Sequence, residues 1–173
     1  MPQRKQNFLF HVLIVTCLPW MPSAMAAVCE LETHDAERWL ERVNEIRSEP
    51  RHCGSVLFAS ASPVKWNAAL LHQARRQART MAERRQLSHL DASGKGLGDH
   101  LLAAGYRWRI QGEVIAAGYS DVEATLQGWL DSPPHCAILM NGQMLEIGAA
   151  CTPSLEGDIY ASYWSMSLAA PKP

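Results

Sequence analysis

The sequence lacks an apolar run long enough to cross a membrane. A transmembrane helix needs about 20 consecutive apolar residues. The N-terminal run from Phe8 to Leu18 is shorter than this, and no later stretch qualifies. There is also no internal repeat and no low-complexity segment, so we expect neither a membrane span nor a repeat architecture.

A net basic charge is also missing. The formal net charge is -1 at pH 7, so no global positive field favours binding to nucleic acid. The local exception is a set of arginines on one predicted helix: Arg75, Arg76, Arg79, Arg84 and Arg85. We interpret them as a solvated helix face rather than as an anion-binding patch.

The first residues have the pattern of an export signal. Arg4 and Lys5 precede the apolar run, and Ala24 and Ala26 form a cleavage site of the A-x-A type. We therefore expect a signal peptide at 1–26 and a single domain at 27–173, in a secreted or periplasmic protein. Removing 26 residues and two positive charges leaves 147 residues with a net charge of -3. An alternative makes Cys17 a lipidated cysteine, although Thr16 is bulkier than the residue expected before such a site.

Four of the five cysteines lie after the expected signal: Cys29, Cys53, Cys136 and Cys151. An even number in an exported domain indicates two disulfides rather than a thiol nucleophile. Cys29 and Cys53 flank a predicted helix of about 14 residues, roughly 21 Å long, so pairing them would require the chain to double back. We favour Cys53 with Cys136 and Cys29 with Cys151. Pairing of Cys136 with Cys151 remains an alternative.

The apolar pattern predicts helices interspersed with a few strands. Helices are expected over 35–48, 67–84, 99–104, 120–130 and 133–141, with Asn67 and the Ser120–Glu123 capping box at two of the starts. Strands are expected over 63–66, 113–117, 146–152 and 158–168, the last two as an antiparallel hairpin. This order favours an α+β sandwich in which helices cover both faces of a small sheet.

Three polar side chains stand at positions that could present them to one site. His89 follows the second predicted helix, Glu113 begins a predicted strand, and His135 follows Pro133 and Pro134 at the start of a helix. Two imidazoles and a carboxylate are normal ligands of a divalent cation such as zinc. They lie too far apart in sequence for a local metal motif, so the fold must bring them together.

The order of these segments resembles the CAP superfamily, also called SCP-like extracellular proteins, and most closely its exported bacterial branch. The resemblance is carried by the segments 42–47, 64–67, 88–89, 112–113 and 129–135 and by the final hairpin, and it covers nearly all of 27–173. It implies a three-layer α-β-α sandwich with a small, mainly antiparallel sheet and an open central cleft. It also implies a cleft site of two histidines and two glutamates, which binds divalent metal in some members.

His89, Glu113 and His135 match three of those four positions, and the fourth differs. The second glutamate of many eukaryotic members falls here on Ser132, and Asp131 is one residue away, which is about 100° around a helix. Val114 also stands where the family usually has asparagine. We therefore expect a divalent metal site, with zinc as the expected ion, that is weaker than in four-ligand members or absent.

Several functions are compatible with these residues. Glu113 could hold His89 or His135 by hydrogen bonds without any metal, and a serine hydrolase built on Ser132 is disfavoured because the sequence has no nucleophile elbow. The resemblance favours a non-enzymatic exported binding module for a small ligand, lipid, peptide, glycan or other cell-envelope component. The alternatives are a metal-assisted hydrolase that uses the same cleft and a purely structural role.

Overall fold

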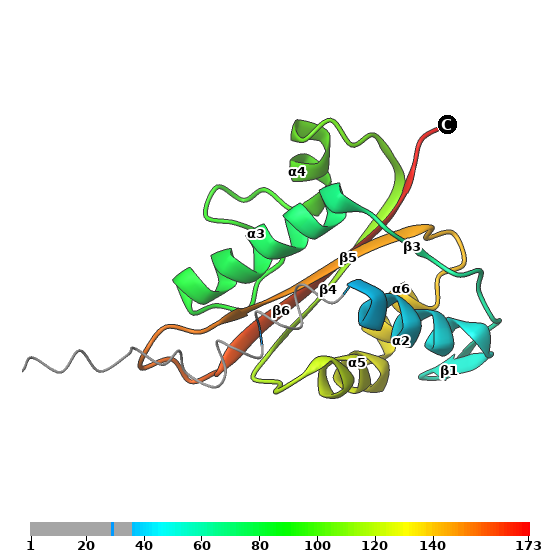
Figure 1. The fold of residues 1–173 in the computed structure, drawn as a ribbon, viewed down its shortest axis with the longest axis horizontal. Coiled ribbons are helices and arrows are strands. Elements are labelled where there is room, and N and C mark those ends of the chain that lie inside the picture. The colour runs from blue at the N-terminus through cyan, green and yellow to red at the C-terminus, as the bar shows by residue number, and fades with distance from the viewer. Residues whose placement is uncertain (1–28, 30–35) are drawn as a thin grey trace, which may run out of the picture.

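The protein folds as three layers, with a sheet between two groups of helices (Figure 1). The computed structural model describes Cys29 and residues 36–173. Helices α3 and α4 cover one face of the sheet, and α2, α5 and α6 cover the other. This is the predicted α+β sandwich. The expected signal peptide at 1–26 and the alternative lipidation site Cys17 lie outside the described residues.

Four strands form the central sheet, in the order β3 (Lys65–Trp66), β5 (Glu146–Pro153), β6 (Ser162–Pro171) and β4 (Trp108–Ala117). The β4–β6 and β5–β6 pairs are antiparallel, and β3 runs parallel to β5. A separate hairpin of β1 (Arg51–Cys53) and β2 (Val56–Phe58) replaces the loop expected between 51 and 62. Within the sheet β4 is an edge strand, so side chains from both helical layers can reach it.

Helix α3 (Ala68–Arg84) packs directly on the sheet. Asn67 Oδ1 caps it by accepting from the amides of Ala69 and Leu70 at 2.8 and 3.2 Å. Its buried face includes small residues such as Ala74 and Ala78, and Gly148 on β5 lies beneath it. A Cβ built at Gly148 would stand 2.0 Å from the Leu71 amide nitrogen. The contact is therefore backbone to backbone, and α4 (Leu97–Ala103) extends the same layer.

The opposite layer holds the main apolar core. It contains α2 (Ala36–Ser48), α5 (Val122–Asp131) and α6 (Pro133–Leu139). Trp39 on α2 lies 6.2 Å from the ring centroid of Trp129 on α5 and equally far from that of Trp164 on β6. All three tryptophans are buried, so they join two helices and the sheet in one cluster.

Arg47 is a fully buried cation near this core. Its guanidinium donates to four backbone carbonyls: Ser62 (3.0 and 3.2 Å), Leu139, Asn141 (3.1 Å) and Met144 (3.2 Å). Burial lowers the pKa of Arg47. The side chain thus connects α2 to the segment before β3 and to the turn after α6.

Two further local predictions are wrong. Strand β4 begins at Trp108 rather than at residue 113, so Glu113 lies in the middle of the strand. The N-cap of α5 is Asp121, whose Oδ1 accepts from the Ala124 amide at 2.8 Å. Ser120 instead donates its hydroxyl proton to the Asp121 carboxylate at 2.8 Å. The carboxylate displaces the expected serine cap because it is the stronger acceptor for the positive end of the helix.

Both favoured disulfides are present. Cys29 bonds to Cys151 across 122 residues, and Cys53 bonds to Cys136 across 83 residues. The alternative pairing of Cys136 with Cys151 does not occur. No helix in the described part of the chain is both long and apolar enough to cross a membrane.

Candidate functional site

Glu113 and His89 form a hydrogen-bonded pair beside the edge strand. Side chains alternate along β4, and Ile115 packs against Met81 and Ala82 of α3, so Glu113 faces the same layer. His89, in the loop after α3, donates from Nδ1 to Glu113 Oε2 at 2.8 Å. The Glu113 side chain is 7% exposed and that of His89 is 52% exposed. The pair therefore joins a buried carboxylate to an imidazole that solvent can reach.

The two partners change each other's titration. Burial raises the pKa of Glu113, although its hydrogen bond to His89 acts in the opposite direction. That hydrogen bond raises the pKa of His89 above its usual value, against the effect of partial burial. The raised pKa of Glu113 favours its protonated carboxyl, and the raised pKa of His89 favours its protonated imidazole. The pair therefore holds its proton to a higher pH than an isolated carboxyl or imidazole would.

His135 reaches the same region from the opposite helical layer. It is the third residue of α6, after Pro133 and Pro134 have set the direction of the first turn. Its side chain is half-buried and has no hydrogen bond or ion pair with any described residue. Burial, and then the charge of His89, lower the pKa of His135. His135 thus lies close enough to His89 for their charges to interact, and its environment favours the uncharged form of the imidazole.

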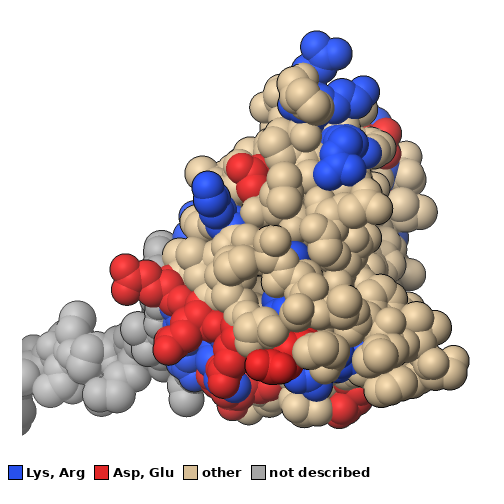
Figure 2. Space-filling model, turned by 90° about the vertical axis from the view of Figure 1, so that its right-hand side faces the viewer, with Lys and Arg blue, Asp and Glu red and all other residues tan. Residues whose placement is uncertain are grey.

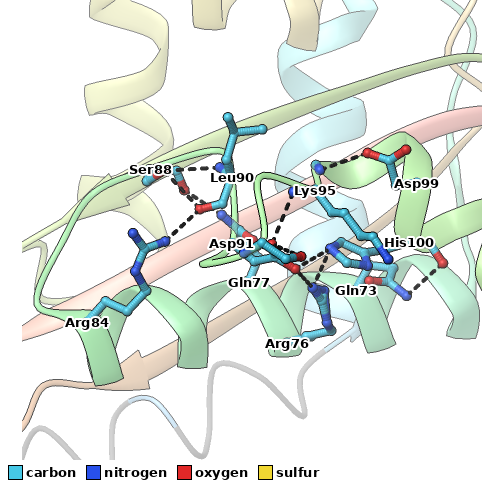
Figure 3. Close-up of polar contacts among 12 residues, drawn as sticks. Gln73, Arg76, Gln77, Arg84, Ser88, Leu90, Asp91, Lys95, Asp99 and His100 are labelled. Carbon is cyan, nitrogen blue, oxygen red and sulfur yellow. Dashed lines mark hydrogen bonds and ion pairs between the residues drawn. The ribbon is translucent and has the colours of Figure 1, made fainter.

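Side chains of α3 hold both neighbours of His89 in place (Figure 3). Gln77 donates to the Ser88 carbonyl, and Arg84 donates to the Leu90 carbonyl at 2.9 Å. The Ser88 hydroxyl also accepts from the Leu90 amide at 3.0 Å. The backbone on each side of His89 is therefore fixed to a helix that is itself packed against the sheet.

Asp91 organises the rest of this loop. Its carboxylate accepts from Arg76 of α3 at 2.9 Å, and Nε2 of His100 of α4 lies 3.0 Å from the same carboxylate oxygen (Figure 3). It also accepts from the Ser93 amide and hydroxyl and from the Lys95 amide at 2.7–3.0 Å. The hydrogen bonds from Ser93 and Arg76 hold the pKa of Asp91 well below its usual range. The charges of His100 and Arg76 also favour ionisation of Glu113.

The residues of α3 that hold the loop around His89, namely Gln77, Arg76 and Arg84, were not identified from the sequence. A glutamine within the apolar face of α3 was the available indication, because a buried amide needs a hydrogen-bond partner. Gln77 is 6% exposed and finds that partner in the Ser88 carbonyl. Arg76 and Arg84 could not be separated from the other arginines of the helix, because the loop that each one contacts is defined only by the fold.

The two residues considered for the fourth ligand position have different environments. Asp131 is exposed at the end of α5 and accepts from Gln127 at 2.7 Å. Ser132 is half-buried between α5 and α6, and its hydroxyl makes no capping hydrogen bond. Among the described residues, no group of three or more His, Cys, Asp or Glu side chains is arranged to hold a metal ion.

The sequence was compared with known families and proteins. Residues 40–167 match the CAP domain, described as the cysteine-rich secretory protein family. Among curated proteins none matches the chain significantly.

Solved structures show the same fold at low sequence identity. An extracellular Bacillus anthracis protein that contains an SCP domain aligns with a TM-score of 0.67 at 24% identity, over 86% of this chain and 44% of its own. An outer surface protein of Borrelia burgdorferi aligns with a TM-score of 0.66 at 17% identity, over 80% of this chain and 93% of its own. This chain thus spans less than half of the Bacillus protein but nearly all of the Borrelia protein.

Proposed function

The chain belongs to the cysteine-rich secretory protein, or CAP, family, and we propose that it is an extracellular binding module whose ligand site is formed by His89, Glu113 and His135. The observation that carries this proposal is the environment of His135. A half-buried imidazole that has no partner among the described residues has lost much of its hydration without gaining a hydrogen bond. A bound group at this position would supply the missing interaction.

The chemistry of these donors suits a divalent metal ion, with zinc as the expected ion, although no group of three such side chains among the described residues is arranged to hold one. His135 and Nε2 of His89 would hold it, because Nδ1 of His89 is already bonded to Glu113. Glu113 would then orient His89, as carboxylates commonly orient metal-binding histidines. Bound metal would supply a Lewis-acid centre that attracts water or an anionic group of the ligand.

Zinc titration calorimetry tests the site. We expect the parent to bind zinc, and His135→Ala and His89→Ala to lose that binding. Glu113→Gln should weaken it by about 10- to 100-fold, the usual effect of removing an orienting partner. His52→Ala is the matched control, because His52 is an exposed histidine of the β1–β2 hairpin.

Two results would contradict the proposal. If the parent binds no zinc, the metal part is wrong. If zinc binds equally well to the parent and to His135→Ala, the ion occupies another site. In either case His89 and Glu113 would be better described as a hydrogen-bonded pair that supports the loop after α3, and His135 would have no part in it.

We also propose that the protein is exported with removal of residues 1–26, which leaves one domain at 27–173. The two disulfides support export, because such bonds persist in oxidising compartments. Intact mass measurement of the protein recovered outside the cytoplasm tests the cleavage site. A mass that includes residues 1–26 would contradict it.

A further inference from the structure

The two helical layers differ in charge. From 68 to 99, which includes α3 and the following loop, there are six basic residues and three acidic ones. From 36 to 49, which includes α2, there are four glutamates and three arginines, and one of those arginines, Arg47, is buried. Figure 2 shows Asp and Glu gathered over the lower part of the molecule, with Lys and Arg among them, at the level of α2 and α5 in Figure 1. The α3 segment therefore has a clear excess of positive charge, whereas the α2 segment is nearly balanced.

The outward side of α3 carries a row of basic side chains. His72, Arg75 and Arg79 lie at i, i+3 and i+7, which places them on one side of the helix. We call these three residues the basic stripe. They line one surface hollow together with Arg76, Thr80 and Glu83. The opposite side of the helix is buried on the sheet, so the stripe cannot turn inward.

Only some arginines of this region are paired. Arg76 bonds to Asp91, and Arg84 and Arg85 donate to the carbonyls of Leu90 and Glu156. Arg75 and Arg79, by contrast, have no hydrogen bond or ion pair with any described residue. Like charges four residues apart destabilise a helix. The two guanidiniums therefore repel each other, and Glu83, which lines the same hollow, forms no ion pair with either of them, so a binding partner could use both.

In place of the solvated helix face expected from the sequence, we propose that the basic stripe binds a linear, phosphate-bearing polymer of the extracellular envelope. Arg75 and Arg79 are separated by about 6 Å along the helix axis, at 1.5 Å per residue. An extended chain of phosphate groups can contact both guanidiniums, each of which suits two-point bonding to phosphate oxygens. This inference does not depend on the site of His89 and His135.

A polymer fits the stripe better than a membrane surface. A helix that lies in a bilayer interface inserts an apolar face beside its basic one, and the apolar face of α3 is buried against the sheet. A thin polymer can instead follow one helix without inserting an apolar face.

Inorganic polyphosphate is the probe for the test, with binding measured by titration calorimetry at two salt concentrations. We expect the parent to bind it, and the affinity to fall as salt rises because counterions are released. Arg75→Gln/Arg79→Gln should bind at least about tenfold more weakly, equivalent to about 1.4 kcal/mol. Arg107→Gln/Arg109→Gln is the matched control, because it removes the same charge from an exposed segment at the start of β4.

Three outcomes would overturn the proposal. The parent could fail to bind polyphosphate. Both double variants could lose affinity equally, which would make the effect one of net charge. Finally, the basic stripe could bind another partner. Vesicles containing phosphatidylglycerol could bind more tightly than polyphosphate, which would indicate a membrane surface. Alternatively, sedimentation velocity could show self-association that Arg75→Gln/Arg79→Gln abolishes, which would indicate a second copy of the chain. Circular dichroism melting of each variant checks that its fold is intact.

Discussion

At the scale of single residues, the hydrogen bond between His89 and Glu113 sets how the site titrates. It raises the pKa of His89, and burial raises that of Glu113. Both shifts have the same consequence for stability. Charged His89 stabilises the folded state. This stabilisation is complete below the pKa of histidine in the unfolded chain, about 6.5, and is lost as pH rises through the pKa of His89 in the folded protein. The cost of burying ionised Glu113 likewise grows as pH rises through its raised pKa.

We predict that the two site histidines titrate on opposite sides of the unperturbed value of about 6.5. His89 should titrate above it and His135 below it, because His89 has a carboxylate partner and His135 is partly buried beside a cation. In Glu113→Gln the His89 midpoint should fall. Nitrogen-15 NMR titration of the imidazoles measures each midpoint. A His89 midpoint that does not move in Glu113→Gln would show that the hydrogen bond is not formed in solution.

The sequence identified some residues of the candidate site but not others. His89, Glu113 and His135 stood out because each lies at the end or start of a predicted element. Their grouping still required the fold, since they come from a loop, an edge strand and a helix of the opposite layer. Gln77 remained hidden because its role depends on a carbonyl that is brought to it by the turn after α3.

At the scale of elements, the first turn of α5 provides a test of its cap. Asp121→Ala should destabilise the protein by about 0.5–2 kcal/mol, because it removes the acceptor for the Ala124 amide. Ser120→Ala should have a much smaller effect, since Ser120 contacts only the Asp121 carboxylate. Urea denaturation measures both. A larger loss for Ser120→Ala would restore serine as the cap and contradict the structure.

The close packing of α3 on β5 at Gly148 provides a second test at this scale. Gly148→Ala should destabilise the fold by about 1–3 kcal/mol or more, because the new methyl group would meet the backbone of Leu70 and Leu71. Gly142→Ala is the control, since its new Cβ would approach Ala61 only to 3.8 Å. Thermal melting compares the two variants. Equal stability would mean that α3 is not held this closely to β5.

Elements with strong local patterns were predicted well, and short exposed ones were not. Helix α3 has a cap at Asn67 and a long apolar face, and both its ends were close to those predicted. The β1–β2 hairpin was missed because Val56 and Leu57 are exposed on three-residue strands, which gives no alternation between buried and solvated positions. Strand β4 extends further back than predicted because its first residues are paired with the C-terminal end of β6.

At the scale of the whole molecule, the two disulfides connect segments that are far apart in the chain. Cys53→Ser/Cys136→Ser should lower the free energy of unfolding by about 2–5 kcal/mol, the usual cost of removing a native disulfide from an exported domain. Chemical denaturation measures the loss. Peptide mapping without reduction should recover Cys53 linked to Cys136 and Cys29 linked to Cys151. Free thiols at these positions in folded, exported protein would contradict both bonds.

Arg47 has a consequence for the order in which the protein folds. Its hydrogen-bond acceptors lie 15 and 92–97 residues away in sequence, so most of these bonds form only after α6 and its turn have docked beside α2. Interactions that form after the transition state affect unfolding rather than folding. In stopped-flow measurements, Arg47→Met should therefore unfold faster than the parent while folding at nearly the same rate. The buried guanidinium would then determine how long the native state lasts once it has formed.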